Sequence, residues 1–159
     1  MKKLVLSLIT IISLTIIIVL ISFIFYKSKN GLIICTYKVQ NDIYEINNIY
    51  KINYKEGFVT NLHTKEQTKA ADEKLLLDSK ISLELMYSNY NKLENYQNTV
   101  TLKDNILTSE TKINYQKLNV KDFINIDKNN KRLFTKDNKV KVSTLKKMYK
   151  DNGARCTYK

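Results

Sequence analysis

Two cysteines are the residues whose type and position suggest a specific chemistry in this chain of 159 residues. Cys35 and Cys156 lie near the two ends of residues 32–159, and each begins the tetrapeptide Cys-Thr-Tyr-Lys. If both segments are strands that lie side by side, a disulfide would close a loop of about 120 residues and stabilise the fold by roughly 4–5 kcal/mol in the chain-entropy model. We predict this disulfide for a domain outside the cytoplasm, with two unrelated buried thiols as the alternative.

Catalytic and metal-binding chemistry finds little support in the residue types. His63 is the only histidine, so zinc held by the usual nitrogen and sulfur ligands is not expected. The sequence has three glycines, and it contains neither a Gly-x-Ser-x-Gly elbow nor a glycine-rich phosphate loop. Four carboxylates could meet in space, although their spacing does not require it: Glu45, Glu56, Asp122 and Asp127. We therefore predict a protein that is not an enzyme and that has no cofactor or metal.

Residues 4–26 form an apolar run without a charged residue, glycine or proline. As a helix this run would be roughly 35 Å long, enough to cross a hydrocarbon layer of about 30 Å. We predict an uncleaved transmembrane anchor, with a tail at residues 1–3 before it and a linker at residues 27–31 after it. The alternatives are a buried core helix, a signal peptide that is removed, and a lipoprotein lipidated at Cys35.

The orientation of this anchor is not decided by charge, because lysines flank the run on both sides. A tail of three residues favours a signal-anchor whose short end stays in the cytoplasm. We therefore predict a single-pass protein of the cell membrane with an extracytoplasmic domain at residues 32–159. The alternative topology is a basic domain that faces the cytoplasm and keeps its thiols reduced.

The charge balance is strongly basic, with a formal net charge of +12. A basic surface favours anionic partners, although the abundance of Lys, Asn, Ile and Tyr also fits an A/T-rich genome without any ligand. No nucleic-acid-binding motif is present, so we predict membrane lipid, an anionic cell-wall polymer or a membrane protein as the partner, and no nucleic acid. Lys27, Lys29 and Lys38, near the predicted membrane surface, are the candidate contacts with anionic head groups.

The domain itself shows strand, helix and turn patterns of an α+β fold. Residues 32–40, 44–54, 58–68, 96–102 and 106–117 have the β-branched and aromatic content or the period-2 alternation of strands. Glu56-Gly57 and Asp104-Asn105 are the turns of two hairpins. We predict an antiparallel sheet of these two hairpins, packed with one long helix at residues 70–93 and a short C-terminal helix at residues 144–152.

The two helices have identifiable ends and faces. Leu76, Leu83, Tyr87 and Tyr90 form one apolar stripe of the long helix, and Leu77, Ile81 and Leu85 widen it toward the sheet. Ser143 is placed to cap the short helix, and Gly153 to end it in a left-handed conformation. Tyr44, Tyr50 and Tyr54 share one strand face, where we favour core packing over stacking on sugars or peptides.

The layout resembles that of a known group of bacterial envelope proteins. A lysine-led apolar start, a cysteine soon after it, two hairpins around a helix and the terminal Gly153-Ala154-Arg155-Cys156 are similar to the YehR-like lipoproteins of low-GC bacteria. The resemblance covers residues 35–156 and implies an α+β domain in the cell envelope, without catalytic residues. This chain departs from the group because it lacks a lipidation motif.

These observations predict a membrane-anchored extracytoplasmic domain that binds a partner at the cell surface without catalysis. A second hypothesis is a pocket for a small ligand or peptide between helix 70–93 and the sheet. An enzyme of unrecognised type would need a cluster of carboxylates around one cleft.

Overall fold

Two tight turns set the pairing of the strands. The computed structural model describes residues 30–159. Glu56 and Gly57 have φ values of 54° and 79°, and Asp104 and Asn105 have values of 51° and 57°. Two successive left-handed residues make a turn whose twist matches that of the flanking strands, so each pair joins two antiparallel neighbours directly. Both hairpin turns expected from the sequence are confirmed.

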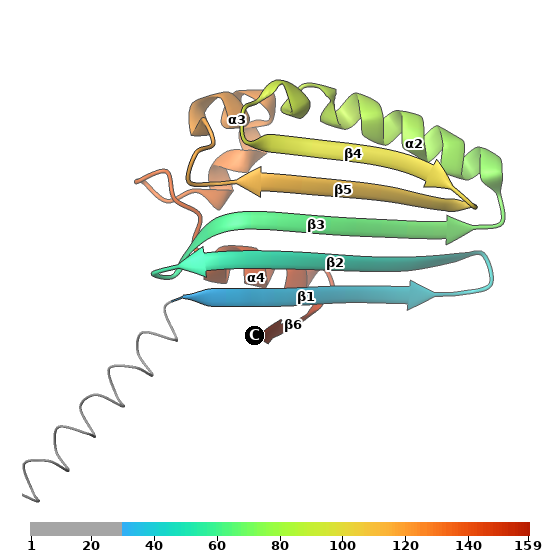
Figure 1. Ribbon diagram of the computed structural model, residues 1–159, viewed down its shortest axis with the longest axis horizontal. Coiled ribbons are helices and arrows are strands. Elements are labelled where there is room, and N and C mark those ends of the chain that lie inside the picture. Colours follow the sequence, from blue (N-terminus) through green and yellow to red (C-terminus); the bar gives the residue numbers. More distant parts are fainter. Residues whose placement is uncertain (1–29) are drawn as a thin grey trace, which may run out of the picture.

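The strands form one six-stranded antiparallel sheet in the order β4-β5-β3-β2-β1-β6 (Figure 1). The strands are β1 (Gly31–Gln40), β2 (Tyr44–Lys55), β3 (Phe58–Ala70), β4 (Tyr96–Lys103), β5 (Ile106–Asn114) and β6 (Arg155–Tyr158). The predicted α+β class and antiparallel sheet are confirmed. The sheet is wider than two hairpins, because β1 pairs with β2 and the C-terminal β6 pairs with β1.

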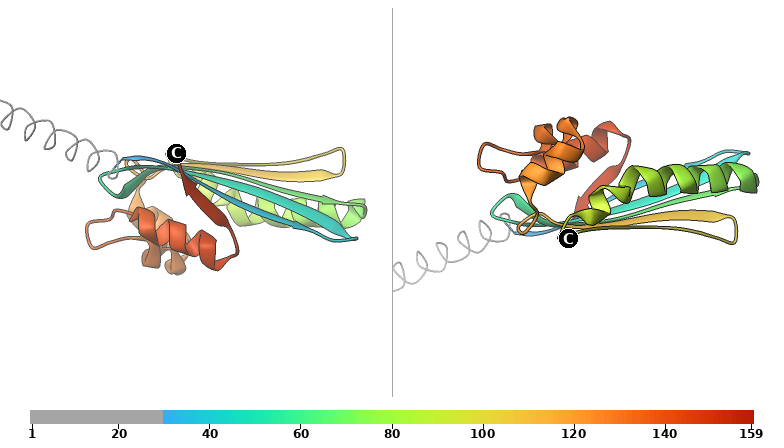
Figure 2. Two further views of the ribbon diagram at one scale, coloured as in Figure 1. Left: turned by 90° about the horizontal axis from the view of Figure 1, so that it is seen from below. Right: turned by 90° about the horizontal axis from the view of Figure 1, so that it is seen from above.

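All helices of the described residues lie on the same face of this sheet (Figures 1 and 2). They are α2 (Glu73–Ser88), α3 (Val120–Ile126) and α4 (Val142–Asp151), with short 3-10 segments η1 (Tyr90–Lys92) and η2 (Lys128–Leu133). Helix α2 contacts β4, β3 and β5, whereas α4 contacts β1 and β6. We call this the covered face; on the opposite, open face, residues 30–159 form no second layer.

The alternation of the strands decides which side chains the helices cover. The buried strand residues of the covered face include Ile33, Cys35, Tyr50, Ile52, Tyr54, Leu62, Tyr96, Leu107, Ser109, Thr111 and Ile113. They pack against buried side chains of the helices, such as Leu76, Phe123, Leu145 and Tyr149. Tyr50 and Tyr54 are therefore core residues, as expected, since burial of their rings removes large apolar areas from water.

A buried amide fixes two polar residues of the core. Asn98 donates from its side-chain nitrogen to Ser109 Oγ at 3.0 Å and to Thr111 Oγ1 at 2.8 Å. These bonds join β4 to β5 within the covered face. They satisfy polar atoms that would otherwise be costly to bury.

The long helix differs from the prediction in its ends and its face. It begins after Asp72, whose side chain accepts from Leu75 N at 3.0 Å, and it ends at Ser88 rather than at residue 93. Leu77, Ile81 and Leu85 remain 47%, 49% and 70% exposed, so the prediction that they widen the buried stripe is wrong. The reason is that α2 rests on one sheet and that no further layer formed by residues 30–159 covers its outer side.

The C-terminal helix also begins earlier than predicted. Helix α4 starts at Val142, and Lys141 at its N-cap makes no side-chain cap, so the proposed cap at Ser143 is wrong. Its start is held instead by the backbone, because Val142 N donates to Gly57 O at 3.0 Å. Gly153 follows the helix with φ 87°, as expected for a left-handed C-terminal position.

The predicted membrane anchor at residues 4–26, the tail at residues 1–3 and residues 27–29 of the predicted linker lie outside the described residues. Among residues 30–159, none of the helices has the length and apolar character to cross a membrane.

Candidate functional site

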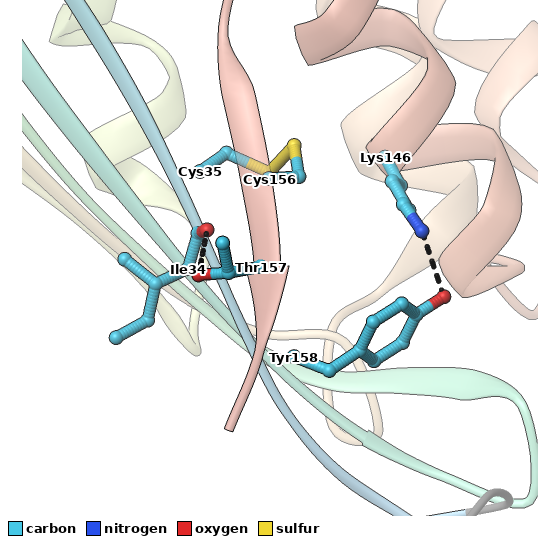
Figure 3. Close-up of a disulfide and its surroundings, with 6 residues drawn as sticks. All are labelled: Ile34, Cys35, Lys146, Cys156, Thr157 and Tyr158. Carbon is cyan, nitrogen blue, oxygen red and sulfur yellow. Dashed lines mark hydrogen bonds between the residues drawn. A yellow bond between two sulfur atoms is a disulfide. The ribbon is translucent and has the colours of Figure 1, made fainter.

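The disulfide is the first of three features that have chemical consequences. Cys35 of β1 and Cys156 of β6 stand directly opposite each other in the antiparallel register, and their sulfurs are bonded at 2.03 Å across 121 positions of sequence (Figure 3). Cys35 is fully buried. The predicted pairing is therefore present, and it closes β6 onto the rest of the sheet. Disulfides of this kind are typical of proteins in oxidising compartments.

Contacts beside the disulfide hold the short strand β6 in place. Lys146 of α4 donates to the Tyr158 hydroxyl at 2.9 Å, and its ammonium lies 4.1 Å from the centre of the Tyr158 ring (Figure 3). Tyr158 also meets Tyr54 edge to face, with ring centres 6.5 Å apart. The chain terminus is therefore tied to β1, to β2 and to α4, which gives the disulfide a structural role.

The lysines predicted to contact anionic groups can be compared with the structure at one position. Lys38 is exposed on β1, and its ammonium lies 3.2 Å from the Glu45 carboxylate of β2. Lys27 and Lys29 lie outside the described residues. Lys38 belongs to a larger basic surface that sequence reasoning did not single out.

The open face is the second feature. Its basic side chains alternate with the buried positions and come from all six strands: Lys38, Lys51, Lys65, Lys69, Lys103, Lys112 and Arg155. Two carboxylates, Glu45 and Glu110, share this face. Lysines and arginines number 27 against 15 acids in the whole chain, so basic residues are enriched on the open face.

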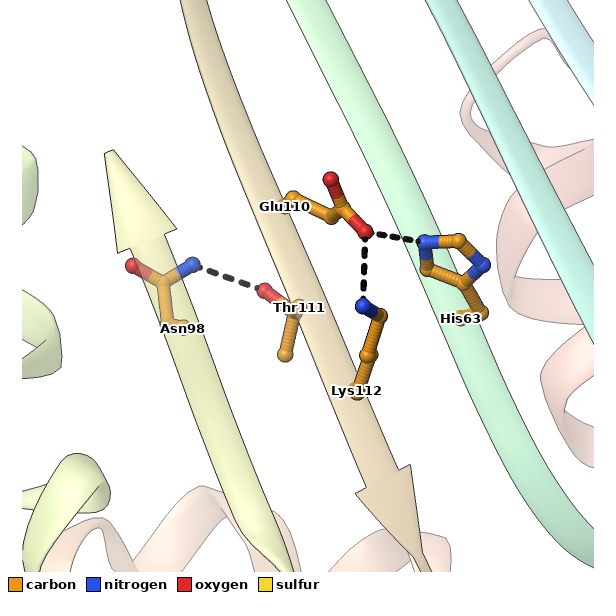
Figure 4. A network of polar contacts seen from close by, with 5 residues as sticks. All are labelled: His63, Asn98, Glu110, Thr111 and Lys112. Carbon is orange, nitrogen blue, oxygen red and sulfur yellow. Dashed lines mark hydrogen bonds and ion pairs between the residues drawn. The ribbon is translucent and has the colours of Figure 1, made fainter. Parts of the chain in front are cut away.

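Glu110 lies within this basic surface and is held by two partners (Figure 4). Its Oε1 is 2.7 Å from His63 Nε2 and 3.1 Å from Lys112 Nζ. Hydrogen bonds from Lys112 and then from His63 lower the pKa of the Glu110 carboxyl. Glu110 is therefore an ionised acceptor at neutral pH, and it does not neutralise Lys51 or Lys65, which form no ion pair among residues 30–159.

A cleft on the covered face is the third feature. It has a volume of about 470 Å³ and lies between the sheet, α2, η2 and α4. Tyrosines contribute much of its lining: Tyr50, Tyr87, Tyr90, Tyr96 and Tyr149. This volume falls within the range of ordinary small-ligand sites. The tyrosine-lined pocket between helix and sheet, our second hypothesis from the sequence, therefore has a physical counterpart.

One acidic residue of the sheet points into this cleft. Glu66 lies on β3 in phase with the buried Leu62 and Thr64, and it lines the cleft beside Tyr50. Burial raises the pKa of the Glu66 carboxyl, and a hydrogen bond from the Tyr50 hydroxyl opposes this effect. No lysine or arginine of residues 30–159 forms an ion pair with it.

The four carboxylates considered from the sequence have separate local roles. Glu45 pairs with Lys38, Glu56 forms a turn, Asp122 accepts from Asn119 Nδ2 at 2.7 Å near the start of α3, and Asp127 accepts from Asn129 N at 2.8 Å. Within residues 30–159, no group of three or more His, Cys, Asp or Glu residues is arranged to hold a metal ion.

Sequence reasoning missed Glu66 and the basic surface, although a signal for each was present. On the strand that contains Leu62 and Thr64, a period of two places Glu66 on the inward side. The same period places Lys51, Lys65 and Lys112 outward on three strands. Only the strand order and register of the sheet show that these three lysines lie near one another.

Comparison with known proteins identifies the fold of the chain but not its function. No protein-family model and no curated protein matches the chain. The NMR structure of Escherichia coli YehR is similar, with a TM-score of 0.53 and 16% identity over 78% of this chain and 89% of YehR. An NMR structure of a protein from Streptococcus pneumoniae has a TM-score of 0.50 and 17% identity, over 82% of this chain and 85% of that one. The chain therefore has a YehR-like fold, as the sequence resemblance implied.

Proposed function

We propose that this protein is a non-catalytic binding module of the cell envelope, which holds an anionic polymer against the open face of its sheet. Residues 4–26 tether it to the cell membrane as a single-pass anchor, with the domain on the extracytoplasmic side. The observation that carries the proposal is the open face, where basic side chains from six strands outnumber acids.

The geometry of a sheet suits a repeating anion. Neighbouring strands lie about 4.8 Å apart, so side chains at paired positions form a regular row. Lys51, His63 and Lys112 are successive partners across β2, β3 and β5, and Lys65 follows two residues after His63. Such an array attracts a polyanion through many weak contacts and releases bound counterions as it does so.

A polymer fits this surface better than a bilayer does. The large hydrophobic side chains that are most exposed lie elsewhere: Ile43 precedes β2, Tyr158 packs beside Lys146, and the others belong to α2. The open face therefore offers little to insert among acyl chains, whereas peripheral membrane surfaces combine apolar insertion with charge. Lys38 belongs to this face, and Lys27 and Lys29 remain predicted contacts near the membrane.

Two features support the location. The Cys35–Cys156 disulfide is expected to form and persist in an oxidising compartment. The apolar run at residues 4–26 is long enough to serve as an anchor. Thiol labelling of intact cells with and without reductant tests the orientation. Labelling that needs reductant supports the external domain, and labelling without it indicates reduced cytoplasmic thiols.

Binding is tested with the full chain in micelles of an uncharged detergent and a soluble poly(glycerol phosphate). The triple variant Lys51→Gln, Lys65→Gln, Lys112→Gln removes three cations of the open face. We expect its affinity to fall by about tenfold or more, and binding by the unchanged protein to weaken steeply with added salt.

The matched control removes three exposed lysines of the helical side by Lys74→Gln, Lys121→Gln and Lys147→Gln. These changes lower the net charge equally but leave the open face intact. Equal losses of affinity in both variants would show a general effect of charge and contradict a specific binding surface. An affinity that does not change with salt, or no binding at all, would also contradict the proposal.

A further inference from the structure

Aromatic rings surround the cleft of the covered face at close range. The Tyr50 and Tyr149 rings stack with centres 4.0 Å apart, and Tyr90 lies 5.2 Å from Tyr96 and 6.3 Å from Tyr87. Each ring presents a negative face or a partly positive edge to its surroundings. The cleft therefore has a polarisable aromatic wall on both the sheet and the helix side.

The orientation of one wall residue is fixed by an amide that also lines the cleft. Asn130 of η2 donates from Nδ2 to the Tyr90 hydroxyl at 3.0 Å and to Phe123 O at 3.1 Å. This pair of bonds ties Tyr90 to the segment that closes the cleft opposite the sheet. The aromatic site is thus held in place before any ligand enters.

Glu66 places a negative charge among these rings. Its charge acts on Tyr50, Tyr87 and Tyr149, and it raises the pKa of each of these hydroxyls in addition to the effect of burial. These hydroxyls are therefore neutral phenols, and the cross-strand neighbours of Glu66 are the uncharged Asn48 and Ser109. A half-buried carboxylate without a cation is unfavourable. Two charged residues also line the cleft: the exposed Arg132, and Asp127, whose carboxylate already accepts from Asn129 N.

The cleft is open to solvent on the side of α2. Met86 at this side is 52% exposed, and Tyr87, Tyr90 and Glu66 are each only partly buried. A small molecule can therefore reach the carboxylate without unfolding the domain.

We propose that this cleft binds a small organic ammonium cation, with the Glu66 carboxylate as its counter-ion and the rings of Tyr50, Tyr87 and Tyr90 around its positive charge. A cation over an aromatic face is attracted by the ring quadrupole, most strongly where water is excluded. The carboxylate and the rings favour the same charge, whereas an anion would meet Glu66 and a neutral ligand would leave it unpaired. This site lies on the opposite side of the sheet from the basic surface, so it is independent of the polymer-binding proposal.

The test titrates the full chain, in maltoside micelles, with choline and with its neutral isostere dimethylbutanol. The chain has no tryptophan, and five of its 11 tyrosines line the cleft, so tyrosine fluorescence follows binding and calorimetry gives the affinity. We expect choline to bind at least about tenfold more tightly than the isostere. Equal binding of the two compounds would show an apolar pocket, and no binding of choline would also overturn the proposal.

Variants identify the site. Glu66→Gln keeps the shape of the side chain and removes its charge, so we expect choline affinity to fall about tenfold or more. The matched control, Glu110→Gln, removes a carboxylate from the open face and should leave choline binding unchanged. Choline affinity that survives Glu66→Gln, in protein whose disulfide has formed, would refute Glu66 as the counter-ion.

A second pair of variants tests the aromatic wall. Tyr87→Leu should weaken choline binding, whereas Tyr44→Leu changes a tyrosine of the covered face that does not line the cleft and should leave it unchanged. Losses of equal size in both variants would show a general effect on the fold and contradict a ring-lined cation site. Poly(glycerol phosphate) binding, measured on the same proteins, should remain, which separates this site from the open face.

Discussion

The two faces of the sheet are built from the same strands but differ in almost every physical property. On β2, Tyr50 and Ile52 point into the core, while Lys51 between them is exposed. The covered face buries aromatic and aliphatic side chains, and the open face carries cations. Because side chains alternate along a strand, one segment can supply stability to one side and a charged surface to the other.

This division has a consequence for substitutions. Changes to the covered face should alter the free energy of unfolding, whereas changes to the open face should alter ligand binding and its salt dependence. Glu66 is the exception, because it carries a charge into the stabilising face. A residue that breaks the local rule of its own face is where function is most expected.

The largest expected effect is on the link between β1 and β6. Replacing both cysteines by Cys35→Ser and Cys156→Ser should lower the free energy of unfolding by about 4 kcal/mol, since the unfolded chain loses a constraint across a very long loop. Urea unfolding of the two proteins measures the difference. An unchanged midpoint would mean that the contacts of Tyr158 with α4 already hold β6 closed.

A matched pair of isoleucines on β2 compares the faces directly. Ile52→Ala on the covered face should cost about 2–5 kcal/mol, because it removes fully buried methyl groups. Ile49→Ala on the open face should cost less than about 1 kcal/mol, since that side chain is only partly buried. Similar midpoints for both variants would show that the open face is covered by something in solution.

Alkaline pH should act through the tyrosines of the covered face. Burial, followed by the Glu66 charge, raises the pKa of Tyr50 to about 12 from the ordinary 10.0. The fold favours the neutral hydroxyl, so this contribution to stability is complete below pH 10.0 and is lost as the pH rises toward about 12. In an ultraviolet titration of tyrosinate, the Tyr50→Phe variant should lack one group that ionises late in the unchanged protein. If all tyrosines of the unchanged protein titrated like free tyrosine, the burial of Tyr50 would be contradicted.

The smallest expected effect is at Glu110 on the open face. Lys112 and then His63 lower the pKa of this carboxyl, so the fold favours the charged form. Its contribution is present above the ordinary glutamate pKa of 4.5 and is lost as the pH falls through the lowered value. Because the pair is exposed, Glu110→Gln should change stability by less than about 1 kcal/mol at neutral pH, as measured by thermal unfolding. A larger change would show that the basic surface needs this carboxylate to fold.

The sequence alone determined the local features of the molecule. Strand patterns identified β1 to β5 and the buried tyrosines of β2, and the residue pairs Glu56-Gly57 and Asp104-Asn105 identified two hairpin turns. The repeated Cys-Thr-Tyr-Lys segments indicated the disulfide. These features depend on residues that are close in the chain or on the chemistry of single residue types, so they are readable without a structure.

Only the tertiary structure decided which side chains gather into surfaces and clefts, because these depend on which distant segments become neighbours. The apolar residues around α2 suggested that Leu77, Ile81 and Leu85 are buried. Only the position of the helix over the sheet shows that these side chains are exposed. The gathering of Lys51, His63 and Lys112 follows from the strand order and register, and the meeting of Glu66 with the tyrosines follows from the packing of α2, η2 and α4. Non-local contacts of this kind leave no periodic signal in the chain, so both candidate binding surfaces became visible only in the folded domain.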